Sequence, residues 1–248
     1  MNDQSRKALH ESRRDSYLDL FIENIKKNKN FTFTKYGDGE MSCITGARGE
    51  NCDGHPYSDE LGSLLKKSLI DNARRENVYI GDWTGWRGDT LSFCRDRILR
   101  SNGINCKNFV LYELLLNHEL EPNEKLYELI KEIKSSERKK IFVGPHKLSA
   151  VNNLINSDGQ IAVQARNAFA AYDSLREQCL SLVDTGCIFI FSCGMPSKIL
   201  INDVLFSEKE LTCLDFGSGF DNIVLDEPTR EGQVNPMDMK SFYKNLLT

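Results

Sequence analysis

The sequence predicts a Rossmann-like α/β fold, with a mostly parallel sheet covered by helices on both faces. Short apolar runs rich in β-branched and aromatic residues alternate with longer amphipathic segments from about residue 30 to residue 216. This alternation is typical of parallel strands joined by crossover helices. The apolar runs are continuous, as in CIFIF at 187–191, which is typical of strands buried on both faces.

The length suits one large α/β domain or two small ones, and because no convincing linker divides the chain we treat residues 1–248 as a single unit. The net charge is −4 and the pI is about 5.7, a balance not typical of nucleic-acid-binding proteins. The first 20 residues lack the apolar segment of a signal peptide, and no run approaches the roughly 18 apolar residues of a membrane span. We therefore expect a cytoplasmic protein whose eight irregularly spaced cysteines are reduced.

The first half of the chain is expected to begin with an N-terminal helix over residues 1–29, which has one apolar face. The alternating segment FTFTKY predicts a strand, and it leads directly into Gly-Asp-Gly-Glu. A polar loop follows, and Ser58 is a plausible helix N-cap. The predicted elements are a strand at 31–36, a loop at 46–57, a helix at 58–75, a strand at 77–81, a loop at 82–88, a helix at 89–101 and a strand at 108–115.

The second half is more regular, because each strand is followed at once by a helix. The predicted elements are a helix at 122–135, a strand at 140–144, a helix at 145–155, a strand at 160–164, a helix at 167–183, a strand at 187–192, a helix at 197–206 and a strand at 211–216. Residues 222–248 are polar and read as a loosely packed C-terminal arm that ends in a short helix at 236–247.

The segment Lys35-Tyr36-Gly37-Asp38-Gly39-Glu40 carries the strongest signal for chemistry. In extended backbone, Asp38 and Glu40 would point the same way. Two such carboxylates suit a hard cation, Mg²⁺ or Mn²⁺, which would neutralise a diphosphate leaving group. The two glycines would admit a bulky ligand close to the backbone. The same residues also fit a tight turn in which Asp38 caps the next helix.

The polar loop that follows holds Asn51, Asp53 and His55. Long polar loops after sheet strands are common places for function. Asp53 or His55 would act as a base toward an acceptor hydroxyl, with Asn51 in contact with the substrate. The alternative is an ordinary surface turn, because Asp-Gly is also a turn signal.

Two strand-to-helix turns are candidates for phosphate binding, since backbone N–H groups at a helix start attract anions. Either turn is also explained by structure alone, because the sequence matches neither a Walker A loop nor GxGxxG. The candidate residues are Gly144, Pro145 and His146 in the first turn, and Gly194, Pro196, Ser197 and Lys198 in the second.

Two further features offer contacts to a nucleotide or a sugar. Asp215 and Gly217 end the last predicted strand and would hold a ribose or a base, or simply turn the chain. Trp83, in the loop at 82–88, offers a face for stacking, although packing in the core is the ordinary role of tryptophan. The arginines Arg95, Arg97 and Arg100 would suit a phosphate backbone, or form a solvated helix face.

Together, these motifs resemble those of the GT-D glycosyltransferases, a family of bacterial and phage proteins, over roughly residues 30–223. The shared features are an aromatic residue before Gly-Asp-Gly-Glu, the Gly-Pro and Gly-x-Pro-Ser-Lys turns, and a Leu-Asp-aromatic-Gly strand end. By this resemblance, Asp38 and Glu40 are the D-x-E pair that binds a divalent metal. Asp215 lies beside the donor, and the diphosphate is lined by Gly144, Pro145, Gly194, Pro196 and Lys198. Lys35 stands where the family often has arginine, so the charge is kept and the bidentate fork is lost.

The resemblance implies a metal-dependent enzyme that moves a sugar from a nucleotide-diphosphate sugar, with a UDP-sugar as the expected donor, to an acceptor hydroxyl. The acceptor is a glycan, a protein or a modified base of phage DNA, and a phage-encoded enzyme would act in the host cytoplasm. Two other functions fit the same residues: a metal-dependent hydrolase of nucleotides or phosphoesters, and a noncatalytic nucleotide-binding module.

Overall fold

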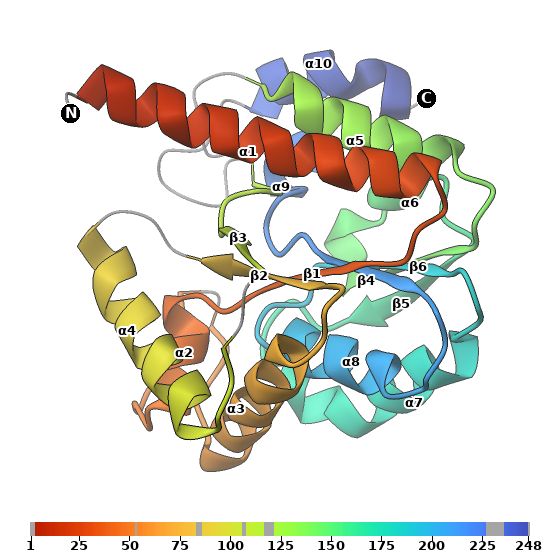
Figure 1. Cartoon of the computed structure of the whole chain (residues 1–248). Coiled ribbons are helices and arrows are strands. Elements are labelled where there is room, and N and C mark those ends of the chain that lie inside the picture. The colour runs from red at the N-terminus through yellow and green to blue at the C-terminus, as the bar shows by residue number, and fades with distance from the viewer. Residues whose placement is uncertain are drawn as a thin grey trace.

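Seven parallel strands form one sheet in the computed structural model (Figure 1), which describes residues 3–52, 54–82, 86–105, 108–116, 122–226 and 236–247. The spatial order of the strands is β3-β2-β1-β7-β6-β4-β5, and all neighbouring pairs are parallel. This confirms the predicted fold class. The strands are β1 (Thr32–Lys35), β2 (Val78–Asp82), β3 (Phe109–Leu111), β4 (Lys140–Pro145), β5 (Gly159–Val163), β6 (Ile188–Phe191) and β7 (Thr212–Asp215).

The central strands are buried on both faces, as their continuous apolar sequences predict. All four residues of β6, Ile-Phe-Ile-Phe, are fully buried, and β6 pairs with β7 in the register Ile188↔Thr212. On one side of the sheet, Phe21 packs against Phe31 and Phe33 with ring centroids 4.7 and 6.0 Å apart. The side chains of adjacent strand residues therefore enter two separate cores, one on each face.

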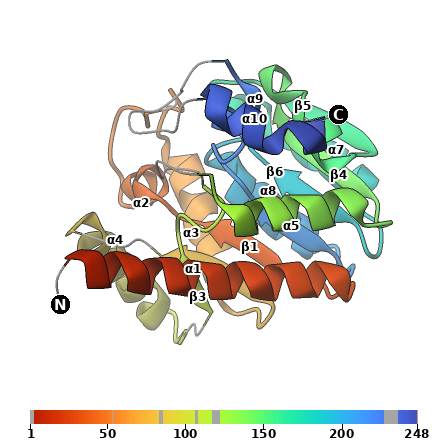
Figure 2. The same ribbon diagram turned by 90° about the horizontal axis from the view of Figure 1, so that it is seen from above.

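One layer of helices covers the face that Phe21 shares (Figure 1). Seen from above, α1 and α5 run across this face with α10 beyond them (Figure 2). The α10 helix packs through Met239 and Tyr243, which are fully buried, so the C-terminal arm is not loosely packed there. The helices of this layer are α1 (Asp3–Lys26), α5 (Glu124–Ser135), α6 (Val151–Ile155), α9 (Asp221–Val224) and α10 (Pro236–Leu247).

A second layer of helices covers the opposite face of the sheet (Figure 1). Its helices are α2 (Asp38–Ile44), α3 (Asp59–Ala73), α4 (Trp86–Ser101), α7 (Tyr172–Leu182) and α8 (Pro196–Leu205). Ser58 caps α3 as predicted, because its side chain accepts a hydrogen bond from the Leu61 N–H. No described helix is long and apolar enough to cross a membrane, and the seven described cysteines are free thiols, as expected.

Several elements differ from the prediction, among them α2, which was not predicted as a helix, and α4, which begins at Trp86 within the predicted loop. The helix expected at 145–155 is a 3₁₀ turn, η1 (His146–Leu148), followed by α6, because Pro145 still belongs to β4. The helix expected at 167–183 likewise begins with a 3₁₀ turn, η2 (Ala168–Ala171). The strand expected at 108–115 ends at Leu111, and turns follow it.

The order of the strands creates a crevice at one edge of the sheet. From β4 the chain continues outward to β5, whereas from the neighbouring β6 it continues inward to β7. Where adjacent strands lead in opposite directions, their connections diverge and leave a space at the carboxyl ends. The loops after β1, β4, β6 and β7 therefore meet at this edge.

We predict that Gly62 sets the spacing between α2 and α3. A Cβ atom at Gly62 would lie 2.5 Å from the carbonyl oxygen of Cys43, so Gly62→Ala must push the two helices apart. The expected loss in the free energy of unfolding is about 1–3 kcal/mol, measured by urea denaturation. Glycine-to-alanine changes within helices usually stabilise the fold by about 1 kcal/mol, so a loss of stability would show that the contact with Cys43 outweighs helix propensity. Ser63→Ala, at an exposed position of the same helix, is the matched control; an unchanged midpoint for Gly62→Ala would contradict the prediction.

Candidate functional site

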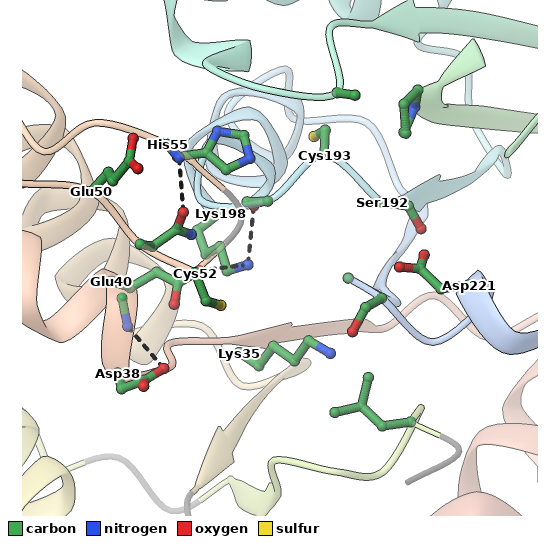
Figure 3. A pocket seen from close by; sticks show the side chains of 18 of the residues that line it. Lys35, Asp38, Glu40, Glu50, Cys52, His55, Ser192, Cys193, Lys198 and Asp221 are labelled. Carbon is green, nitrogen blue, oxygen red and sulfur yellow. Dashed lines mark hydrogen bonds and ion pairs between the residues drawn. The ribbon is translucent and has the colours of Figure 1, made fainter. Parts of the chain in front are cut away.

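A cavity of about 480 Å³ opens at the carboxyl edge of the sheet (Figure 3). Residues at the ends of β1, β3, β4, β5, β6 and β7, or just after them, line it. The polar loop after α2 forms one wall. Of the residues singled out from the sequence, those that line the cavity are Lys35, Asp38, Gly39, Glu40, Asn51, His55, Pro145, Gly194, Lys198 and Gly217.

Other predicted site residues lie near the cavity without lining it. Tyr36 is buried, and its hydroxyl is 3.0 Å from Ser68 Oγ and 3.1 Å from Asn72 Nδ2, both on α3. Burial raises the pKa of the Tyr36 hydroxyl well above its ordinary value, so the group stays neutral. The remaining residues of this set are Gly37, Gly144, His146, Pro196, Ser197 and Asp215, while Asp53 and Trp83 lie outside the described residues.

The expected alignment of Asp38 and Glu40 is wrong, because both residues belong to the first turn of α2. Successive helical residues are rotated by about 100°, so residues two apart point in nearly opposite directions. Asp38 is exposed at the cavity wall, and Glu40 is buried. The Gly37 N–H donates to Glu40 Oε2 at 2.8 Å, which is half of a capping box. The alternative, a tight turn in which Asp38 caps the next helix, is right about the helix start and wrong about the cap, because the N-cap residue is Gly37.

The ammonium of Lys198 lies between two buried carboxylates. Its Nζ atom is 3.0 Å from Glu40 Oε1 and 3.0 Å from Asp215 Oδ2. The three side chains are almost fully withdrawn from water, with exposures of 3% for Lys198, 9% for Glu40 and 0% for Asp215. We call this group the Lys198 bridge. It connects the start of α2, the start of α8 and the end of β7.

Within the Lys198 bridge, the pKa shifts of Lys198 and Glu40 both favour the charged, ion-paired form at neutral pH. Burial acts to lower the pKa of Lys198, but the carboxylates of Asp215 and Glu40 outweigh it and raise that pKa well above its ordinary value. Burial acts to raise the pKa of Glu40, but the charge and hydrogen bond of Lys198 outweigh it, so the pKa of Glu40 lies below its ordinary value.

The turn before α8 places Lys198. Gly194 has φ of +67°, a conformation that glycine adopts without strain. Pro196 opens α8 at its first turn, where no N–H is needed. Ser197 Oγ is 3.3 Å from the Cys193 N–H, which donates to it, and Lys198 Nζ donates to the Gly194 carbonyl at 3.2 Å. The turn is thus held by its own residues and points Lys198 at Glu40.

The described residues of the polar loop form a wall of the cavity and are held by their own hydrogen bonds. Asn51 and His55 are tied reciprocally, because His55 N–H donates to Asn51 Oδ1 at 2.9 Å and Asn51 N–H donates to the His55 carbonyl at 3.0 Å (Figure 3). His55 is 4% exposed. A Cβ atom at Gly194 would lie 2.7 Å from His55 Nε2, so the imidazole packs directly on the turn before α8. The polar loop and the turn before α8 therefore hold each other in position through this contact.

Lys35 is the second buried lysine at the cavity. It leaves the end of β1 and donates to the Phe216 carbonyl at 3.0 Å. Its ammonium is 5.2 Å from the ring centroid of Tyr112, and a Cβ atom at Gly217 would lie 2.9 Å from Nζ. Glycine at 217, with φ of +55°, thus leaves room for the lysine.

The sequence reasoning missed several residues that line the cavity. Ser192 and Asp221 stand at the edges of motifs that were singled out, directly before Cys193 and at the end of the Leu214–Asp221 segment, so a strand-end search would have found them. Tyr112 lay within a predicted strand and carried no such signal. Further lining residues that were not chosen include Ser42, Glu50, Cys52, Tyr57 and Gln164.

A cation does not fit between Asp38 and Glu40. Both oxygens of Glu40 already have protein partners, so a metal there would have to displace the Lys198 ammonium. Within the described ranges, no group of three or more His, Cys, Asp or Glu side chains gathers to hold a metal. Asp38 lies at the cavity wall, and Mg²⁺ is usually bound by one or two carboxylates together with phosphate oxygens. The donor set therefore fits a cation held by Asp38 and a phosphate ligand.

The arginine strip on α4 is not a continuous basic surface. The Arg95 guanidinium is buried and forms ion pairs with Asp82 and with Asp96, the latter at 2.8 Å. It also lies 3.7 Å from the ring centroid of Phe109. Only Arg97 and Arg100 of the three are exposed.

No family model matches the chain, and no curated protein matches its sequence. Two solved structures of the domain of unknown function 1792 are similar to it in fold. One, described as having a distinct glycosyltransferase fold, has a TM-score of 0.59 and 16% identity over 90% of this chain and 87% of its own. The other, substituted with selenomethionine, has a TM-score of 0.57 and 14% identity over the same shares. At these identities the likeness shows the fold alone: the chain has the GT-D glycosyltransferase fold that its motifs suggested.

Proposed function

We propose that this protein is a glycosyltransferase that moves a sugar from a nucleotide-diphosphate sugar to an acceptor hydroxyl. The observation that supports this most is the convergence of three motifs, through the Lys198 bridge, on one cavity in a chain with a glycosyltransferase fold. Ligands of open α/β sheets bind at the carboxyl edge, where this cavity lies.

The donor diphosphate is proposed to lie between Lys35, Lys147 and the turn before α8, all of which line the cavity. Departure of a nucleoside diphosphate develops negative charge, and fixed cations in a partly dry site stabilise that charge strongly. Asp38 would hold a divalent cation, Mn²⁺ or Mg²⁺, together with the diphosphate oxygens. When bound, such a cation supplies further neutralisation of the leaving group.

The acceptor is proposed to be a hydroxyl of a glycan or a protein rather than of DNA. Arg95, a member of the strip that would have followed a DNA backbone, is buried in ion pairs. The carboxylate of Glu50 lines the cavity and would repel a polyanion. His55 lines the same cavity and is the candidate base toward the acceptor hydroxyl.

We predict that a nucleoside diphosphate raises the melting temperature of the protein, and that UDP and UDP-sugars give the largest shift. A ligand that binds only the native state stabilises it by mass action, by about 2.7 kcal/mol at a hundred times its Kd. Thermal denaturation with UDP-, GDP-, dTDP- and CMP-sugars, each with Mn²⁺ or with EDTA, is the measurement. A shift with none of them would contradict the proposal, and nucleotide release without any acceptor would point to a hydrolase.

We predict that Asp38→Asn affects metal-dependent binding and transfer, whereas Glu40→Gln lowers the stability of the fold. Asp38→Asn should remove the dependence of binding and transfer on Mn²⁺ while changing the free energy of unfolding by less than about 1 kcal/mol. Glu40→Gln should lower that free energy by about 1–3 kcal/mol, because Lys198 loses a charged, hydrogen-bonded partner. Asp59→Asn, in the exposed first turn of α3, is the matched control for a lost helix-start charge.

The stability gap between wild type and Glu40→Gln should depend on pH. The folded-state pKa of Glu40 lies below its ordinary value of 4.5, so the carboxylate stabilises the fold above pH 4.5. That contribution is lost as the pH falls through the folded-state pKa, and the two urea midpoints should converge in acid. Equal loss of stability in Asp38→Asn and Glu40→Gln at neutral pH would show that the two roles are assigned wrongly.

A further inference from the structure

A buried serine at the cavity has a hydroxyl that no described residue pairs with. Ser192 follows the last residue of β6 and is 6% exposed. Its hydroxyl has no hydrogen-bond partner among the residues that the structure describes, although its backbone N–H donates to the Val143 carbonyl at 2.8 Å. An unmet buried hydroxyl costs stability unless a ligand meets it. Ser192 lines the cavity, so a rotation about its Cα–Cβ bond would turn the buried hydroxyl toward a bound molecule.

A carboxylate faces this hydroxyl across the cavity edge. Asp221 is 9% exposed, lines the same cavity, and points toward Ser192 in Figure 3. The backbone holds the two segments together, because the Phe191 carbonyl accepts hydrogen bonds from Phe216 N–H at 2.9 Å and Gly217 N–H at 3.3 Å. The Asp221 N–H in turn donates to the Ser218 carbonyl at 3.1 Å. The end of β6 and the segment after β7 thus form one surface.

We propose that Ser192 and Asp221 form a subsite for a vicinal diol of the bound ligand. A carboxylate accepts a hydrogen bond from one hydroxyl, and a serine hydroxyl can donate to or accept from its neighbour. Charge-assisted bonds of this kind are shorter and stronger than neutral ones. This inference rests on the proposed function, in which the ligand is a nucleotide-diphosphate sugar, because both its ribose and its sugar carry such diols.

The surroundings of the subsite agree with this ligand. Lys35 packs against Gly217 and lines the same cavity as Asp221, so a cation for a phosphate and a carboxylate for a diol face one space. Asp215, the carboxylate that the family resemblance places beside the donor, is fully buried on Lys198. Of these two carboxylates, Asp221, at the start of α9, is therefore the one that lines the cavity.

The test is a coupling experiment between protein and ligand hydroxyls. Calorimetry gives Kd values of wild type, Ser192→Ala and Asp221→Asn for UDP, GDP and ADP, each with its 2′-deoxy and 3′-deoxy form. The same proteins are titrated with UDP-glucose and its 2-deoxyglucose counterpart. Removing the recognised hydroxyl should weaken binding to wild type about tenfold or more. The variants should bind the intact ligand about tenfold more weakly and lose little more when that hydroxyl is also removed.

Controls separate a ligand contact from damage to the fold. Ser192→Ala removes a hydroxyl without a described partner, so its melting temperature should equal or exceed that of wild type, which keeps the test valid even if Asp221→Asn unfolds. Ser42→Ala removes a hydroxyl from the α2 wall of the same cavity and should show no coupling to either diol.

Each outcome decides between the sources of the diol or against the subsite. Coupling to the ribose hydroxyls assigns the subsite to the nucleotide, and coupling to the pyranose hydroxyl assigns it to the transferred sugar. Unchanged affinity in both variants, or losses that simply add, would overturn the subsite while leaving the glycosyltransferase proposal intact. Failure of wild type to bind any of these nucleotides would overturn the proposed function and this inference with it.

Discussion

The Lys198 bridge is the interaction on which the arrangement of the site depends. Taking an ammonium and two carboxylates out of water costs several kcal/mol per ion, and their attraction offsets this only when the geometry is held closely. Here the partners come from three places far apart in the sequence: the first turn of α2, the first turn of α8 and the end of β7. The requirement to keep these charges paired therefore fixes how three strand ends meet.

Several glycines near the bridge are explained by this requirement. Gly194 adopts a positive φ and leaves room for the His55 imidazole. Gly37 donates its N–H to Glu40, and a Cβ atom there would lie 2.6 Å from the Tyr112 hydroxyl. The glycines of these motifs therefore have a structural role around the buried ion pairs, besides any role in ligand binding. For function, the two acidic residues differ: Glu40 positions the start of α2, and Asp38 faces the cavity.

The sequence predicted the sheet and most helices because their signals are local. A continuous apolar run such as that of β6, followed by a proline at the first helical turn, identifies a buried strand and the next helix without any distant information. The start of α2 was not predicted, because a segment as short as Asp38-Gly39-Glu40 does not distinguish the first turn of a helix from the end of a strand. The same limit applies to η1, where Pro145 was assigned to a helix but remains in β4.

The site was only partly predictable, because its main contacts join residues far apart in the chain. Nothing in a sequence window indicates that Lys198 meets Glu40 and Asp215, or that Arg95 folds onto Asp82 instead of facing solvent. The motifs marked the right loops, and the side chains that reach the cavity were often their neighbours. Asp221 and Ser192 illustrate this, since both flank residues that had been chosen.

The most direct test of the account is the stability of Lys198→Met compared with that of the triple variant Lys198→Met, Glu40→Gln and Asp215→Asn, measured by urea unfolding. Removing the ammonium alone leaves two buried carboxylates unpaired, so we expect a loss of about 3–5 kcal/mol. Removing all three charges removes that conflict, so the triple variant should regain most of the lost stability. A Lys198→Met midpoint equal to that of wild type, or a triple variant no more stable than Lys198→Met, would contradict the claim that this bridge organises the site.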